Sequence, residues 1–269
     1  MYASLVLSSI LLMLFATLLP AAILKTLGLG PRYDLVTVVK NKVWTHGYSQ
    51  SNSVSTIIRG KDGKLWIRSP PPIKGNEAVL TRIKALGDVA VVYGTHSHDS
   101  HVDQWIEAFP GATMMAPKRD TGLISARQQV DVAIEDAVDV RANFGLEIVD
   151  NPAQVFADPF ILVDVGEPHG SALLLPCGFA TFDFNVWNPV HWLLRLSGFA
   201  KNSTKVSYIR LFSFLFSSTE GMRKAEPVIA QLCALNDVRI IIPLHGPARF
   251  GAPNAYLGGL SPIEARRFF

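Results

Sequence analysis

A chain of 269 residues can form one large domain or two small ones, and because 49% of its residues are hydrophobic, one sizeable core is possible. The formal net charge of +3 is small for this length and the basic residues are scattered, which argues against nucleic-acid binding. Only two cysteines occur, Cys177 and Cys233, which excludes a disulfide-rich secreted scaffold but does not settle the compartment.

The N-terminal segment is an uncharged apolar run from Tyr2 to Leu24. At a rise of about 1.5 Å per residue this run would span the roughly 30 Å of bilayer hydrocarbon. We therefore expect residues 1–28 to anchor the protein to a membrane through a single transmembrane helix. The alternative is a cleaved signal peptide and a secreted protein, but no Lys or Arg precedes the run, and Pro20-Ala21-Ala22 is a poor cleavage site.

The basic residues nearest to this run all follow it, at Lys25, Arg32, Lys40 and Lys42. Because loops that stay in the cytoplasm carry an excess of Lys and Arg, we expect the rest of the protein to be cytoplasmic. The sequon at Asn202 would matter only if the domain were lumenal.

Residues 29–52 are interpreted as a linker and entry segment, and residues 53–269 as the globular domain. Within that domain, two strand-like stretches at 53–58 and 64–68 flank the turn sequence Gly60-Lys61-Asp62-Gly63, which predicts a β-hairpin. Apolar residues at helical spacing predict helices, and short buried-type runs predict strands. The helices are expected at 76–86, 102–108 and 225–235, and further strands at 89–93, 113–116, 160–165, 172–175 and 239–243. This order is that of a mixed α/β protein.

Three imidazoles and a carboxylate directly follow the buried strand 89–93, in Thr95-His96-Ser97-His98-Asp99-Ser100-His101. In an extended segment, residues two apart point the same way, so His96 and His98 can face one metal ion. Zinc favours imidazole nitrogen, and a catalytic zinc usually has three protein ligands and an open position for water. A third ligand is therefore required. Two candidates lie near predicted strand ends, His169 in a turn and His245 after the last strand.

These histidines resemble those of the metallo-β-lactamase superfamily, whose pattern is H-x-H-x-D-H after a strand, then a lone His before a Gly, an Asp or Cys after the next strand, and a late His-Gly. The resemblance covers about residues 53–247. It implies an αββα sandwich, here preceded by the transmembrane helix. His96 and His98 match the first two histidines of the motif, and His101 matches the one that closes it.

The later positions of the superfamily pattern also have matching residues in this sequence. His169 matches the third histidine of the first metal site, and His245 matches the terminal histidine. Cys177 falls where the superfamily usually has a metal-bridging Asp, and where one subclass of β-lactamases has a cysteine ligand. From the residues alone, Cys177 could equally be a small buried hydrophobic residue, whereas Cys233 lies on an apolar helix face and is expected to pack.

The sequence departs from the superfamily pattern at Ser100, which occupies the position of the motif's Asp, while Asp99 lies one residue earlier. A one-residue slip reverses the facing of a side chain in an extended segment. The resemblance implies that this Asp helps to bind a second metal and orients the water, so its replacement weakens the second metal site. The stretches 86–89 and 105–112 resemble a divergent branch of the superfamily in which the motif is often altered.

We therefore expect a metal-dependent hydrolase of a small-molecule substrate, in which one or two zinc ions activate a bound water. Asp99 or His101 would take the proton, although Asp99 could instead be a second ligand, a residue that orients an imidazole, or a loop cap. The expected metal ligands are His96, His98, His169, Cys177 and His245. Two alternatives stay open: an iron-dependent oxidoreductase, since imidazole also suits iron, and a non-catalytic metal-binding or interaction protein, which Ser100 supports.

Overall fold

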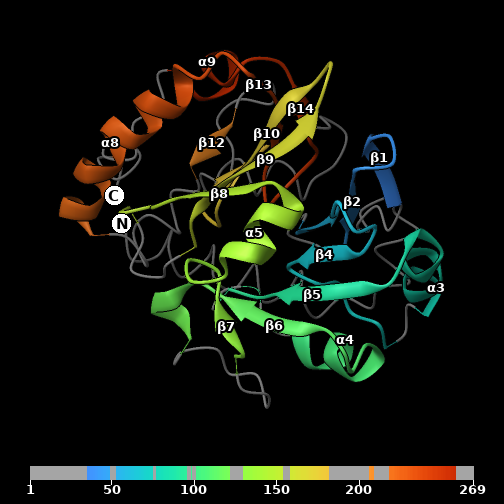
Figure 1. Ribbon diagram of the computed structural model, residues 1–269. Helices are drawn as coiled ribbons and strands as arrows, with labels where there is room; N and C mark the ends of the chain where they lie inside the picture. The colour runs from blue at the N-terminus through green and yellow to red at the C-terminus, as the bar shows by residue number, and fades with distance from the viewer. Residues whose placement is uncertain are drawn as a thin grey trace, which may run out of the picture.

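In the computed structural model, two β-sheets face each other and helices cover both outer faces (Figure 1). The structure describes residues 35–48, 53–74, 77–95, 98, 101–121, 130–153, 158–181, 206–208 and 218–258. The expected membrane segment at 2–24 lies outside these residues. Within the described part of the chain, no helix is both long and apolar enough to cross a membrane.

The first sheet has seven strands in the order of the sequence. Its first four strands form an antiparallel meander, and from β4 onward neighbouring strands are parallel. Parallel neighbours need crossover connections, which here include α3 (Glu77–Leu86) and α4 (Val102–Ala108). The strands are β1 (Leu35–Val39), β2 (Val43–Gly47), β3 (Val54–Arg59), β4 (Leu65–Arg68), β5 (Val89–Tyr93), β6 (Thr113–Ala116) and β7 (Val132–Ala133).

The second sheet has five strands in the order β14, β13, β10, β9, β8, and within it only the β10–β13 pair is parallel. The strands are β8 (Leu146–Val149), β9 (Phe160–Gly166), β10 (Gly170–Leu174), β13 (Val238–Ile242) and β14 (Arg249–Phe250). The remaining elements are the helices α5 (Val138–Phe144), α8 (Thr219–Cys233) and α9 (Pro253–Leu257), the 3-10 turn Lys118–Asp120, and the strand pair β11 (Phe179–Ala180) and β12 (Ser207–Tyr208).

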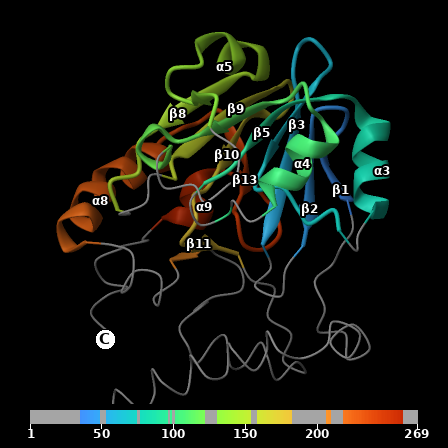
Figure 2. The ribbon, with the colours of Figure 1, turned by 90° about the horizontal axis from the view of Figure 1, so that it is seen from below.

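Three apolar layers separate the elements, and together they define an αββα sandwich. The inner layer lies between the sheets and includes Trp66, Val91 and Ile240. A second layer joins the outer face of the first sheet to α3 and α4, and a third joins the outer face of the second sheet to α8 and α9. Figure 2 shows α3 and α8, one helix from each of these outer layers, on opposite sides of the molecule. Strands buried on both faces, such as β5, have the continuous apolar sequence that this architecture requires.

Most elements expected from local pattern are present, including the hairpin of β3 and β4, the helices α3 and α4, and the strands β5, β6, β9, β10 and β13. The interpretation of residues 29–52 as a linker does not hold for the described residues among them, because β1 and β2 are strands of the first sheet. The burial pattern of β1 does not alternate, and its Val36 is 54% exposed at the sheet edge. The sequence of β1, LVTVV, is a short apolar run rich in β-branched residues, which is typical of a strand, so a local signal was present and the linker interpretation overlooked it.

Candidate metal centre

The candidate site lies where strands from both sheets end at the same edge of the sandwich. In the first sheet β5 is parallel to β4 and β6, and its carboxyl end leads through Gly94 and Thr95 toward His98. In the second sheet β10 and β13 are parallel, and their carboxyl ends lead to Cys177 and His245. The carboxyl ends of parallel strands are a common place for ligand sites in α/β proteins.

The loop that carries His245 is fixed by backbone hydrogen bonds. Leu244 accepts a bond from the backbone N–H of Val54 at 2.8 Å, and His245 accepts one from Thr181 at 2.9 Å. Gly246 has a φ of 96°, and a Cβ placed there would come within 1.8 Å of the Thr181 carbonyl oxygen. Glycine is therefore needed after His245, both for the backbone angle and for the close approach.

Cys177 lies in a tight turn directly after β10. Its backbone N–H donates to Oδ2 of Asp158 at 2.6 Å, and Gly178 continues the turn with a φ of 97°. Leu175 is tied to β13 through Ile242 at 2.9 Å. The thiol is therefore held over the end of the second sheet, where it is 3% exposed.

His98 is oriented by a neighbouring phenol. Its Nδ1 lies 3.2 Å from the hydroxyl of Tyr48, which directly follows β2 at the same edge of the sandwich, so Nε2 is the ring nitrogen left for a metal ion. Burial, together with the charges of His245 and Arg68, lowers the pKa of His98 well below its usual value, so the imidazole is neutral. Burial also raises the pKa of Tyr48, so the phenol keeps its proton.

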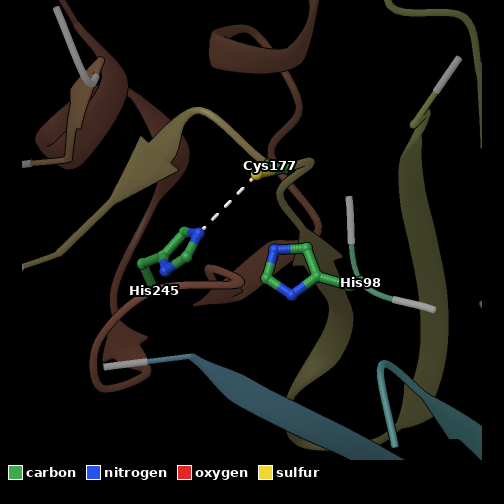
Figure 3. A group of neighbouring side chains, drawn as sticks. All are labelled: His98, Cys177 and His245. Atoms are coloured by element: carbon green, nitrogen blue, oxygen red, sulfur yellow. Dashed lines mark hydrogen bonds between the residues drawn. The ribbon is translucent and has the colours of Figure 1, made fainter. Parts of the chain in front are cut away.

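The three side chains form one cluster, with ligand atoms of His98, Cys177 and His245 all within 4.8 Å of one another (Figure 3). Sγ of Cys177 and Nε2 of His245 are 3.6 Å apart, and the two imidazole centroids are 5.2 Å apart. In a tetrahedral zinc site, with bonds of about 2.3 Å to sulfur and about 2.0 Å to nitrogen, ligand atoms lie roughly 3.3–3.5 Å apart. The donor set and its spacing therefore fit zinc with small movements of the side chains.

The structure does not bring His169 to this cluster. His169 lies in the turn that joins β9 to β10, at the amino end of β10, whereas Cys177 follows the carboxyl end. The five residues of β10 alone span roughly 17 Å. The match in sequence order placed His169 among the expected ligands. Because His169 precedes β10 and Cys177 follows it, the two residues lie at opposite ends of this strand.

The other expected site residues fall into two groups. His96 and Asp99 lie outside the described residues, as does Ser100. His101 precedes α4 and packs edge-on against Tyr48, with ring centroids 6.1 Å apart. Burial lowers the pKa of His101, and its buried Nδ1 has no hydrogen-bond partner among the described residues. His101 thus borders the cluster without belonging to it.

Sequence reasoning missed three residues that support the cluster: Tyr48, Arg68 and Asp158. Tyr48 falls within the segment interpreted as a linker. Arg68 ends the otherwise apolar strand β4, on the same face as the buried Trp66, so strand parity could have marked it as a buried charge. Asp158 had no comparable signal, since a carboxylate before a strand is usually solvated.

No protein-family model and no curated protein sequence matches the chain, whereas many solved structures do. One is a metallo-β-lactamase, DIM-1, in a crystal exposed to ceftazidime, with a TM-score of 0.52 and 14% identity over 88% of this chain and 98% of that chain. Another is a metallo-β-lactamase from Erythrobacter litoralis, with a TM-score of 0.50 and 12% identity over 87% of this chain and 92% of that chain. At such identities the likeness establishes the fold.

Proposed function

We propose that this chain, whose fold is that of the metallo-β-lactamases, is a zinc-dependent hydrolase of a small molecule. The observation that carries the proposal is the meeting of two imidazoles and a thiol at the carboxyl ends of β5, β10 and β13. His98, Cys177 and His245 would hold the metal. His96, two residues before His98 in the sequence, is proposed as a further ligand.

The donor set favours zinc over iron, because thiolate is a soft ligand and the alternative iron sites rest on imidazole and carboxylate. A bound zinc would supply a water of lowered pKa and would polarise the bond to be cleaved. Within the chain, Tyr48 holds the His98 ring in place, and the buried surroundings of Cys177 exclude bulk water from the thiol. His101, which packs against Tyr48 and whose Nδ1 has no hydrogen-bond partner among the described residues, is proposed as the proton acceptor, with Asp99 as the other candidate.

Elemental analysis of the protein purified without added metal tests the proposal directly. We expect about one equivalent of zinc, since the cluster offers one complete set of donors. Two equivalents would mean that Asp99 or His101 completes a second site despite Ser100. A protein that neither contains zinc nor takes it up would refute the proposal, and stoichiometric iron would favour an oxidoreductase instead.

Hydrolysis is tested separately from metal binding. The wild-type protein loaded with zinc is assayed on generic esters, phosphodiesters and lactams, beside a Cys177→Ala variant loaded in the same way. We expect hydrolysis of at least one class by the wild-type protein and none by the variant. Equal rates in both would assign the activity to a contaminant.

A second candidate function is a non-catalytic metal-binding protein, favoured by the burial of Cys177 and His245, which are 3% and 7% exposed, and by Ser100 in place of the motif's Asp. A structural zinc has four protein ligands, whereas a catalytic zinc keeps one position open. The cobalt-substituted protein distinguishes them. A visible spectrum that changes when azide or cyanide is added indicates an open position, and an unchanged spectrum supports the non-catalytic candidate.

We also propose that residues 1–28 anchor the protein to a membrane, with the domain on the cytoplasmic side, on the basis of the uncharged run from Tyr2 to Leu24. The full-length chain should sediment with membranes and resist extraction by carbonate, whereas a chain starting at Gly30 should not. A mature N-terminus after Ala22 would instead identify a cleaved signal peptide.

A further inference from the structure

Arg68 is a fully buried charge close to the metal cluster. It ends β4, pairs in register with Tyr93 of β5, and is 0% exposed between the two sheets. Burying a guanidinium is costly unless it is paired and hydrogen-bonded. A charge at this position in an otherwise apolar strand therefore calls for a specific role.

Asp158 is the partner of Arg68, and it lies on the other sheet, just before β9. Nη2 of Arg68 donates to Oδ1 of Asp158 at 3.0 Å and to Oδ2 at 3.2 Å. Within the described part of the chain, the buried Nε and Nη1 of Arg68 have no hydrogen-bond partner. Asp158 is itself 1% exposed, and its carbonyl oxygen accepts a bond from Asn151 at 3.3 Å.

The ion pair continues into the cluster through a third group. Oδ2 of Asp158, the oxygen 3.2 Å from Arg68, also accepts the backbone N–H of Cys177 at 2.6 Å. Three residues from three separate segments are thus linked by one buried series of hydrogen bonds, from Arg68 to Asp158 to the Cys177 backbone. This series of hydrogen bonds connects the end of β4 in the first sheet to the turn after β10 in the second.

We propose that Arg68 and Asp158 are positioning residues that hold the Cys177 thiol toward His245 for metal binding, an inference that rests on the proposed metal site. The carboxylate fixes the peptide N–H of Cys177, and the positive φ of Gly178 turns the chain directly after it. The guanidinium neutralises the carboxylate, so the N–H acceptor adds no net negative charge beneath the thiol. Residues that orient metal ligands in this way affect metal affinity strongly.

A matched pair of neutral double variants separates this role from stability. Arg68→Met with Asp158→Asn removes both charges and keeps an oxygen that can accept the Cys177 N–H. Arg68→Met with Asp158→Leu removes both charges and the acceptor, and its Leu side chain has the same number of heavy atoms and the same branching as Asn. Val163→Ala, a truncation at a fully buried core position on β9, serves as a control for lost stability alone.

The full-length variants are stripped of metal and titrated with Co²⁺, and affinity is read together with the sulfur-to-cobalt charge-transfer band and the unfolding midpoint. We expect the Leu double variant to lose on the order of 10- to 100-fold in affinity and much of the band. The Asn double variant and Val163→Ala should keep the wild-type cobalt affinity and charge-transfer band, even if their unfolding midpoints are lower. Wild-type affinity and band in the Leu double variant would overturn the proposal.

The single variant Asp158→Glu tests the same point if the double variants do not fold, because it keeps the charge of the pair and displaces the acceptor oxygen by one methylene. Reduced cobalt affinity and a weaker band are expected, and an unchanged site would again overturn the proposal. If the wild-type protein itself binds no cobalt through sulfur, it is the proposed metal site that fails, which distinguishes the two hypotheses.

Discussion

The two ends of β10 differ in their capacity to form a metal site. At its carboxyl end the chain passes through Pro176 into a turn that holds Cys177, next to the end of the parallel strand β13 and His245. At its amino end an antiparallel turn leads back to β9 and carries His169, which is partly exposed. Each end offers a potential metal ligand, but only the carboxyl end brings several together within the described residues.

This difference shows that a metal site does not form wherever a suitable ligand residue occurs. It forms where strand ends bring several such residues together. A turn between two antiparallel neighbours presents residues of one segment only. Parallel strands β10 and β13 end at the same edge, and β5 of the facing sheet ends there too, so residues far apart in sequence meet. A lone histidine in a turn binds metal weakly, whereas three converging donors form a site.

The sharpest test of this comparison removes a ligand from each end. His245→Ala should abolish tight zinc binding, with a loss on the order of 100-fold or more, because only two donors of the cluster remain. His169→Ala is the matched control and should keep the wild-type affinity. Competition with a chromophoric chelator measures both. Equal losses in the two variants would break the distinction between the two ends.

Two glycines test the same comparison through protein stability. Gly246 lies in the loop after β13 at the metal cluster, and Gly166 is the last residue of β9, at the turn that leads to the other end of β10. Gly246 at the site end has a φ of 96°, and an added Cβ would meet the Thr181 oxygen at 1.8 Å, whereas Gly166 at the far end has a φ of 76° with open space around it. We expect Gly246→Ala to lower the free energy of unfolding by about 3 kcal/mol, through backbone strain and overpacking, and Gly166→Ala by about 1 kcal/mol, through strain alone. Urea unfolding measures the difference, and the reverse order would contradict the described geometry of the His245 loop.

A smaller effect is expected from the residue that orients His98. Tyr48→Phe removes the hydroxyl 3.2 Å from Nδ1 and keeps the ring, so zinc affinity should fall about 10-fold with little change in stability. Tyr256→Phe is a suitable control, since that hydroxyl donates to the carbonyl of Phe250 at 2.7 Å, on the edge strand β14. An unchanged affinity in Tyr48→Phe would mean that the His98 ring is held by other contacts.

The smallest effect on tight zinc binding is expected at His101, which borders the cluster through Tyr48 without joining it. His101→Ala should change the affinity of the first zinc by no more than about 3-fold, because a neighbour outside the ligand set acts only indirectly. Isothermal titration with zinc shows both affinity and stoichiometry. A loss as large as that of His245→Ala would instead indicate a coupled centre with two metals.

Local sequence determined much of the fold and part of the site. The continuous apolar run of β5 and the turn glycines between β3 and β4 indicated where these elements begin and end, because side-chain burial and backbone angles act over a few residues. The same signals placed Cys177 and His245 just after strands. His98 was marked by its position after a buried strand.

Only the tertiary structure decided which of these strand ends meet. The antiparallel pairing of β9 and β10 separates His169 from the cluster, and the pairing of β2 with β3 brings Tyr48 to His98. The link from Arg68 to Asp158 crosses between two sheets over 90 positions of sequence. Strand direction and sheet pairing follow from burial of the whole core, a long-range energy that no short stretch of sequence contains, and the chemistry of this site depends on it.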